Sequence, residues 1–310
     1  PAAKKIISWS DGRITGIPIL NNTGLGMMYN KEIFEKVGIT ELPKSWNEFL
    51  DDCEKIKQAG ITPVNIQVAN GSEFGATHLM HQLFSNVYIT RGDGVKDLLE
   101  QLNTHKVKYS EVPEFVQSLK QIVELRDKGY INEDFISTTY EMSQDKFGKG
   151  EVAMHPCGDF ILQPMLAKYP DLNIGFFPTP FEVTQGVIAS CAGNGLSVSS
   201  KAKYKEEALE LVDYFASKEV QEKYMEKSPG MGVFSDVKSN DNAISADMTK
   251  YANMGFVAPE VALHFLAWPE MDARKIIQEL LLGTKTPEQM LEEIDKKAEI
   301  VAKGKNLQGW

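Results

Sequence analysis

Short polar side chains and aromatic rings occur together where predicted strands give way to loops. Carboxylates and amides hydrogen-bond hydroxyl groups, and an aromatic ring covers the apolar C–H face of a sugar. Taken singly, Asp159 would be a helix cap, Trp268 a core residue and Phe74 a helix-packing residue. The combination predicts a carbohydrate-binding site, with these candidate residues: Asn22, Thr23, Glu73, Phe74, Gly158, Asp159, Phe160, Asn194 and Trp268.

The central stretch of the chain, 147–160 (FGKGEVAMHPCGDF), shows how such residues are positioned. The amphipathic run 139–149 predicts a helix, and the apolar run 152–157 is typical of a buried strand. Gly158 allows a sharp turn, and Asp159 is suited to cap the next helix. Free backbone N–H groups and Phe160 then lie at the carboxyl end of a strand, where open α/β sheets bind ligands.

The remaining elements alternate between the two types of secondary structure. Short apolar runs predict strands over 14–20, 25–29, 62–67, 152–157, 172–177, 186–190 and 196–199. Amphipathic runs predict helices over 31–37, 45–60, 73–86, 95–102, 112–128, 139–149, 161–168, 205–216, 218–226, 246–254, 271–282 and 287–302. This alternation predicts an α/β fold, and a chain of 310 residues favours two domains.

Composition excludes several kinds of partner. The net charge of −10 and the pI near 5.2 disfavour nucleic acid and anionic membrane surfaces, because both would repel the chain. No run approaches the roughly 18 apolar residues that a membrane-spanning helix needs. The three cysteines, Cys53, Cys157 and Cys191, are too few for a disulfide scaffold and are expected to be small buried side chains.

Patterns for catalysis or metal binding are weak. The sequence has no H-E-x-x-H, P-loop or G-x-S-x-G motif. His78 and His81 are spaced to share a helix face, but a third metal ligand does not accompany them. We therefore predict no catalytic residue, no metal site and no cofactor.

Several short motifs, in order along nearly the whole chain, carry a family resemblance. The chain resembles the extracellular solute-binding proteins of ABC importers, in the carbohydrate-binding group (family 1) that includes maltose- and multiple-sugar-binding proteins. The matching runs are DGRITGIP at 11–18, MYNK at 28–31, KSWNE at 44–48, FGKGEVAM at 147–154 with Gly158, AGNGL at 192–196, KEEALELV at 205–212 and GTKTPEQ at 283–289.

The resemblance implies a type II periplasmic-binding-protein-like α/β fold, with two lobes joined by crossing strands and a ligand in the cleft between them. It implies a lipid-anchored, extracytoplasmic transport protein that hands a sugar or oligosaccharide to a membrane permease. Phe160 takes the place of a Trp that stacks on sugar in such relatives, and the smaller ring leaves the size of the sugar open. The other implied cleft positions are Asn22 and Thr23 on the first crossing strand, Glu73 and Phe74 at a helix start, Asn194 after the second crossing segment, Met231 in a first-lobe loop, and Trp268 as a late aromatic.

The start of the chain departs from the family pattern. In the family, the Asp-Gly-Arg…Ile-Pro motif follows roughly a hundred residues, about a domain's worth of chain, but here it begins at Asp11. We therefore expect an incomplete first lobe, made of 1–17 plus 191–244, and a second lobe made of 18–190 plus 245–310. A missing cleft wall predicts weak sugar binding by this chain, and uncovered apolar surface predicts self-association.

Three other functions remain open. A phosphorylated or other anionic ligand is disfavoured because none of the four arginines (Arg13, Arg91, Arg126 and Arg274) falls in the predicted cleft loops. A carbohydrate-active enzyme would need two carboxylates roughly 5–10 Å apart, and Glu73 and Asp159 are the cleft candidates. A pure interaction module would show an exposed apolar patch and no pocket.

Overall fold

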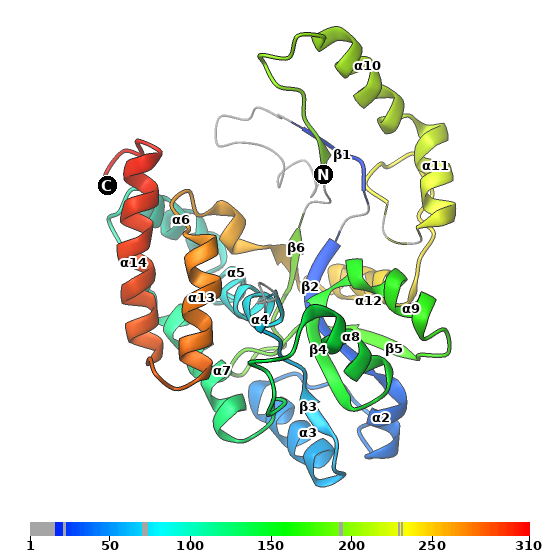
Figure 1. The fold of residues 1–310 in the computed structure, drawn as a ribbon, viewed down its shortest axis with the longest axis vertical. Helices are drawn as coiled ribbons and strands as arrows, with labels where there is room; N and C mark the ends of the chain where they lie inside the picture. Colours follow the sequence, from blue (N-terminus) through cyan, green and yellow to red (C-terminus); the bar gives the residue numbers. More distant parts are fainter. Residues whose placement is uncertain (1–15, 21–22, 70–73, 192–194, 229, 231) are drawn as a thin grey trace.

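The computed structural model describes residues 16–20, 23–69, 74–191, 195–228, 230 and 232–310. Its centre is a mixed six-stranded sheet in the order β3-β4-β2-β6-β8, with β5 also paired to β2 (Figure 1). The strands are β2 (Thr23–Asn30), β3 (Thr62–Val64), β4 (Val152–Gly158), β5 (Ile174–Phe177), β6 (Ile188–Cys191) and β8 (Val257–Pro259). The predicted α/β class is therefore observed.

Strand β2 organises the sheet. It runs antiparallel to β4, β5 and β6, whereas β3 is parallel to β4 and β8 is parallel to β6. The first half of β2 pairs with β6, where Thr23 lies opposite Cys191, and its second half pairs with β5. Because Leu25 lies opposite Gly158, the start of β2 meets the carboxyl ends of β4 and β6 at one edge of the sheet.

Helices form where caps and apolar spacing predict them. Helix α14 (Pro287–Gly304) begins with a capping box between Thr286 and Gln289 and with Pro287 at its first turn. Ser45 caps α3 (Trp46–Gln58). The other helices of four or more residues are α2 (Lys31–Lys36), α4 (Phe74–Phe84), α5 (Val87–Thr90), α6 (Val95–Asn103), α7 (Pro113–Asp127), α8 (Tyr140–Gly148), α9 (Leu162–Lys168), α10 (Lys205–Ala216), α11 (Lys218–Lys227), α12 (Ala243–Asn253), η5 (Val261–His264) and α13 (Glu270–Leu281).

Helix α4 is the centre of the main core. It packs on β4 and β2 and contacts α7 and α13, and helix α14 lies against α13 and α7 (Figure 1). Its buried residues include polar ones, Thr77, His81 and Gln82, as well as apolar ones, so it is buried on all sides rather than along one stripe. Leu79, Met80, Leu83 and Phe84 are fully buried.

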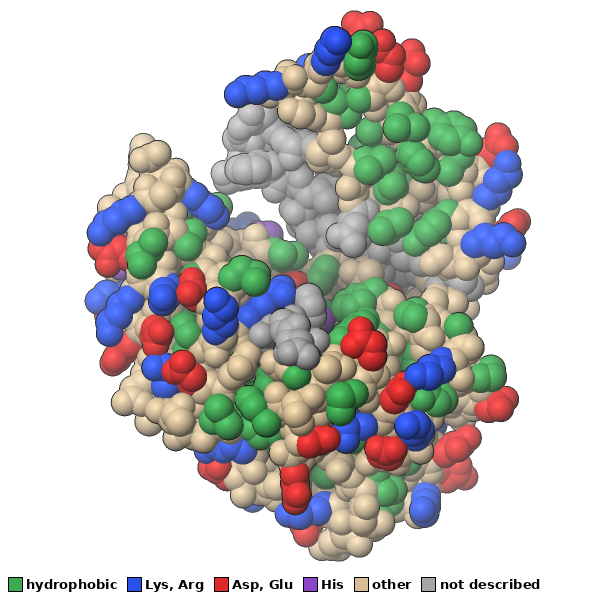
Figure 2. Space-filling model, viewed as in Figure 1, with side chains coloured by type: hydrophobic (Ala, Val, Ile, Leu, Met, Phe, Trp, Pro, Cys, Tyr) green, Lys and Arg blue, Asp and Glu red, His purple; other side chains and the backbone are tan. Residues whose placement is uncertain are grey.

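Helices α10 and α11 stand apart from this core, at the top of Figure 1, near the small ribbon of β1 (Ile17–Pro18) and β7 (Gly195–Leu196). Hydrophobic side chains gather on the surface of this part in Figure 2. In and next to α10 the exposed apolar side chains are Tyr204, Leu209, Leu211, Tyr214 and Phe215. The sequence predicted both helices, but much of the apolar surface of α10 is uncovered.

Several observed elements differ from the predicted ones. The sequence interpretation assigned no element to the residues of β8 and α5, and in place of the predicted strand 196–199 the structure has the two-residue β7. The predicted strand 62–67 ends at Val64, because the side chain of Asn132 takes the Ile66 N–H at 2.7 Å in place of a neighbouring strand. Among the described residues, no helix is both long and apolar enough to cross a membrane.

Candidate functional site

A cavity of about 500 Å³ opens at the sheet edge where β2 begins and where β4, β6 and β8 end. Helix α4 and the segment leading into α13 complete its walls. The lining side chains combine aromatic, aliphatic and charged groups: Thr23, Leu25, Thr77, His78, His81, Phe160, Cys191, Glu260, Ala262, Leu263, Phe265, Trp268, Glu270 and Arg274. This cavity therefore lies at the carboxyl end of β4, where an α/β sheet of this kind places a ligand.

Three of the predicted site residues line this cavity: Thr23, Phe160 and Trp268. Thr23 is the first residue of β2. The ring of Phe160 is 48% exposed and meets the ring of His78 edge-on, with centroids 5.8 Å apart. Phe160 therefore presents an open aromatic face, which is the property that the sequence analysis required of it.

Trp268 is a buried wall of the cavity rather than an open platform. Its indole packs edge-on against Tyr109 and Phe84, at centroid distances of 5.3 and 6.2 Å. Its Nε1–H donates to Glu270 Oε2 at 2.8 Å. These contacts fix the ring, so Trp268 combines the core role and the cavity position that the sequence had presented as alternatives.

Gly158 and Asp159 lie at the same edge but support the cavity from behind. A Cβ on Gly158 would come within 2.3 Å of the Phe160 ring, so the glycine lets Phe160 occupy its place. The expected helix cap at Asp159 is wrong: Gly158 holds the N-cap position, and Asp159 opens the 3₁₀ turn η4 (Asp159–Ile161). The Asp159 carboxylate is buried and accepts the Gly24 N–H, and burial raises the pKa of Asp159 to about 7.

The structure leaves the other predicted site residues undecided. Phe74 is the first residue of α4, and only this backbone position is described. The remaining four lie outside the described residues: Asn22, Glu73, Asn194 and Met231.

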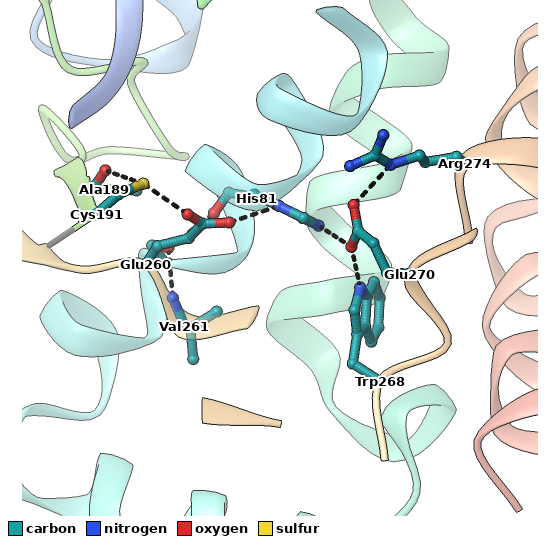
Figure 3. Close-up of polar contacts among 9 residues, drawn as sticks. His81, Ala189, Cys191, Glu260, Val261, Trp268, Glu270 and Arg274 are labelled. Atoms are coloured by element: carbon teal, nitrogen blue, oxygen red, sulfur yellow. Dashed lines mark hydrogen bonds and ion pairs between the residues drawn. The ribbon is translucent and has the colours of Figure 1, made fainter. Parts of the chain in front are cut away.

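The sequence analysis missed a chain of charged groups that forms one wall of the cavity (Figure 3). His81 Nδ1 lies 2.7 Å from Glu260 Oε1, and the Cys191 thiol donates to Glu260 Oε2 at 2.8 Å. On the other side, His81 Nε2 lies 3.7 Å from Glu270 Oε2, and Arg274 Nε donates to Glu270 Oε1 at 2.8 Å. Each carboxylate is thus held by more than one donor.

These contacts shift protonation equilibria. Burial raises the pKa of Glu260, but the hydrogen bond and charge of His81 outweigh it and leave this pKa below its usual value. Burial and the charge of His81 lower the pKa of His78 to about 3, so His78 is neutral near pH 7. His78 is therefore a neutral imidazole in the cavity lining, together with the ionised carboxylate of Glu260.

One sequence signal pointed to this wall. Phe256 to Pro259 is a short apolar run that follows Gly255 and ends in a proline. Such a run is typical of a buried strand, and Glu260 follows it directly. Arg274 lines the cavity from α13, outside the predicted cleft loops, so the absence of arginine from those loops does not exclude an anionic ligand. The position of Arg274 depends on how α13 packs against α4, which the local sequence does not express.

The carboxylate pair considered for an enzyme is not at the cavity as proposed. Asp159 is absent from the lining, and Glu73 lies outside the described residues. His81 pairs with Glu260 rather than with His78 in a shared metal site. Within the described part of the chain, no group of three or more His, Cys, Asp or Glu residues is arranged to hold a metal ion.

The chain is thus an α/β protein with a cavity at the edge of its central sheet, where β2 begins. Residues 2–222 match the profile of the bacterial extracellular solute-binding proteins, and the chain belongs to this family. The resemblance noted in the sequence is thereby confirmed.

Individual relatives are distant but similar along most of the chain. A multiple sugar-binding protein of Streptococcus mutans is 24% identical over 241 residues, covering 77% of this chain and 56% of its own length. A chitin oligosaccharide binding protein has the same fold, with a TM-score of 0.77, 23% identity and coverage of 96% and 74%. The solute-binding protein RafE, solved with raffinose, has a TM-score of 0.74 and 21% identity, and the match covers 96% of this chain and 78% of RafE. This chain thus spans just over half of the first relative, and the likeness confirms the predicted fold class.

Proposed function

We propose that this chain is the sugar-binding part of an extracytoplasmic component of an ABC importer, and that it binds a sugar or oligosaccharide in the cavity without transforming it. The observation that carries the proposal is the cavity wall itself. Phe160 offers an open aromatic face, and the fixed carboxylates of Glu260 and Glu270 can accept ligand hydroxyls. Sugar recognition needs this combination of an apolar ring contact and oriented acceptors.

The relatives support the same class of ligand. RafE was solved with raffinose, and other similar proteins are named for chitin oligosaccharides and multiple sugars. We extend sugar binding to this chain on the strength of the shared family and the cavity. A membrane permease as partner, a position outside the cytoplasm and a lipid anchor on the whole protein follow as parts of this proposal.

Helices α10 and α11 support the proposed division into lobes. The second lobe would comprise 18–190 plus 245–310, and 1–17 plus 191–244 would be the incomplete first lobe. The exposed apolar side chains of α10, such as Leu211 and Tyr214, are what a lobe without all of its partners would show. This chain would then bind sugar weakly and self-associate through that face.

Arg274 favours a second candidate function, the binding of an anionic solute, because a guanidinium at the cavity could pair with a phosphate. Two observations oppose it. The guanidinium already donates to Glu270, and the charges of Glu260 and Glu270 would repel an anion. A neutral sugar therefore remains the better fit.

Thermal unfolding with a ligand panel tests these proposals. The panel contains raffinose, stachyose, chitin oligosaccharides, galactose and a sugar phosphate, applied to this chain and to the full-length gene product. We expect a neutral sugar to raise the melting temperature, since a ligand that binds the native state stabilises it by mass action. Phe160→Ala should lower the affinity for that sugar by roughly tenfold, in line with a lost aromatic contact of about 1.5 kcal/mol. A melting-temperature shift with the sugar phosphate alone would favour the anionic ligand. No shift with any sugar in either protein would reject sugar binding.

A further inference from the structure

His81 joins two parts of the cavity wall that come from distant parts of the sequence. Its ring lies between Glu260, which follows β8, and Glu270, the first residue of α13 (Figure 3). Both carboxylates line the cavity, and His81 itself is buried within α4. The imidazole therefore lies where it can set the relative position of two binding groups.

The geometry favours a protonated ring at His81, with a hydrogen bond to Glu260 and an ion-pair contact to Glu270. Nδ1 is 2.7 Å from Glu260 Oε1, and Nε2 is 3.7 Å from Glu270 Oε2. A neutral imidazole has one N–H, so one nitrogen would turn a lone pair toward an ionised carboxylate. The imidazolium has two N–H groups and can direct one to each carboxylate.

The surrounding groups act on His81 in both directions. Burial and Arg274 disfavour the imidazolium, whereas Glu260 and Glu270 favour it and prevail, so the pKa of His81 is raised above its ordinary value. His78 is neutral near pH 7, and burial keeps the Cys191 thiol protonated. Burial also lowers the pKa of His264, which follows Glu260 on η5, so His264 adds no charge near pH 7. Asp159, behind the cavity, has a pKa of about 7 and titrates in the neutral range.

We propose that protonated His81 is a positioning residue of the sugar site, which holds the carboxylates of Glu260 and Glu270 in the orientation that receives the ligand. This inference rests on the proposed function. Loss of the proton leaves Nε2 without an N–H for Glu270 and removes the charge that both carboxylates share. Sugar affinity then falls as the pH rises through the pKa of His81, and by linkage a bound sugar raises that pKa.

The ion pair of His81 and Glu260 also makes the stability of the fold depend on pH. His81 has a raised pKa in the fold, so its contribution is complete below pH 6.5 and is lost as pH rises through the folded value. Glu260 has a lowered pKa, so its contribution is present above pH 4.5 and is lost as the solution becomes more acidic. The ion pair is therefore strongest between these limits.

A pH titration of three proteins tests the proposal: the wild type, His81→Gln and His264→Gln. The His264→Gln control removes a nearby imidazole that does not bridge carboxylates. NMR of the imidazole groups locates the pKa of His81, and calorimetry with raffinose, or with the panel sugar that gives the largest thermal shift, measures affinity at pH 6 and one unit above that pKa. We expect the wild type and the control to lose at least about fivefold in affinity, and His81→Gln to show a flatter profile. The titration of Asp159 is common to all three proteins and cancels in this comparison.

A second variant tests the bridge without any ligand. Glu270→Gln removes one of the two facing charges and should lower the pKa of His81. Equal affinity profiles in the wild type and His81→Gln would overturn the proposal, as would a His81 pKa below 6.5 or one that Glu270→Gln leaves unchanged. If no sugar in the panel binds at pH 6, the sugar function fails, and the NMR titration still decides whether His81 forms the bridge.

Discussion

Helices α4 and α10 are similar in length and both carry apolar side chains, yet the structure treats them in opposite ways. In α4, which packs against the sheet, α7 and α13, Leu83 is fully buried. In α10, Leu211 is 53% exposed and Tyr214 is 61% exposed. An apolar pattern is enough to predict a helix, but the partner that covers it supplies most of its stability. The core around α4 should therefore unfold as one unit, and α10–α11 should open at a lower free energy.

The largest expected effect is on the free energy of unfolding. Leu83→Ala leaves a cavity in the core and should destabilise the protein by about 2–5 kcal/mol. Leu211→Ala removes the same atoms from an exposed site and should cost within about 0.5 kcal/mol. Urea denaturation followed by circular dichroism, at low protein concentration, measures both. Equal losses would show that α10 is packed in solution as firmly as α4.

Acid should weaken the core through His155. This side chain is buried in β4, and burial lowers the pKa of His155 to about 4. The unfolded chain binds the proton with its ordinary pKa near 6.5, so stability is lost as the pH falls from 6.5 to about 4. The loss is up to about 3 kcal/mol.

Unfolding of His155→Gln across this pH range provides the test. Its stability should change less with pH than that of the wild type, while His105→Gln, a change at a ring stacked on Trp310 near the chain end, should keep the wild-type slope. A wild-type slope in His155→Gln would contradict the assignment to His155.

The exposed face of α10 should control self-association. Leu211→Asp combined with Tyr214→Ser places polar groups on that face and should lower the average mass at high protein concentration. Sedimentation velocity measures the effect. Val183→Ser, at a side chain that is 88% exposed away from α10, is the control and should leave the mass distribution unchanged. If the control dissociates the protein and the double variant does not, the contact lies elsewhere.

A small effect on stability is expected at Gly158. Alanine there would collide with the Phe160 ring, but that ring is half-exposed and can rotate away. Gly158→Ala should therefore lower the free energy of unfolding by no more than about 1 kcal/mol. It should still lower the affinity for the sugar that Phe160 contacts. A thermal melt and a binding titration on the same sample separate the two effects. Unchanged affinity would argue against a ligand contact at Phe160.

Local sequence signals accounted for most of the elements. Capping at Ser45 and Thr286 and apolar spacing in α7 predicted helices close to their observed bounds. The turn at Gly158 correctly placed Phe160 at the end of a buried strand. Each of these features depends on residues within a few positions of one another, which is the range over which a single sequence is informative.

The charged wall of the cavity could not be predicted in the same way. It exists because β8 pairs with β6 and because the following turn packs on α4, as in the bond from the Val261 N–H to Ser85 Oγ, 176 positions apart. His81 alone predicts only a helix-face histidine, and Glu270 alone predicts only a favourable charge in a first turn. Their meeting is a property of the tertiary fold.

The thiol of Cys191 has a consequence for the handling of this protein in an oxidising environment. Oxidants and disulfides react with the thiolate, and burial together with the charge of Glu260 raises the pKa of Cys191 well above its ordinary value. Burial does the same for Cys53 and Cys157. We therefore expect the three free cysteines to react slowly with a maleimide while the fold is native, and faster labelling would report unfolding.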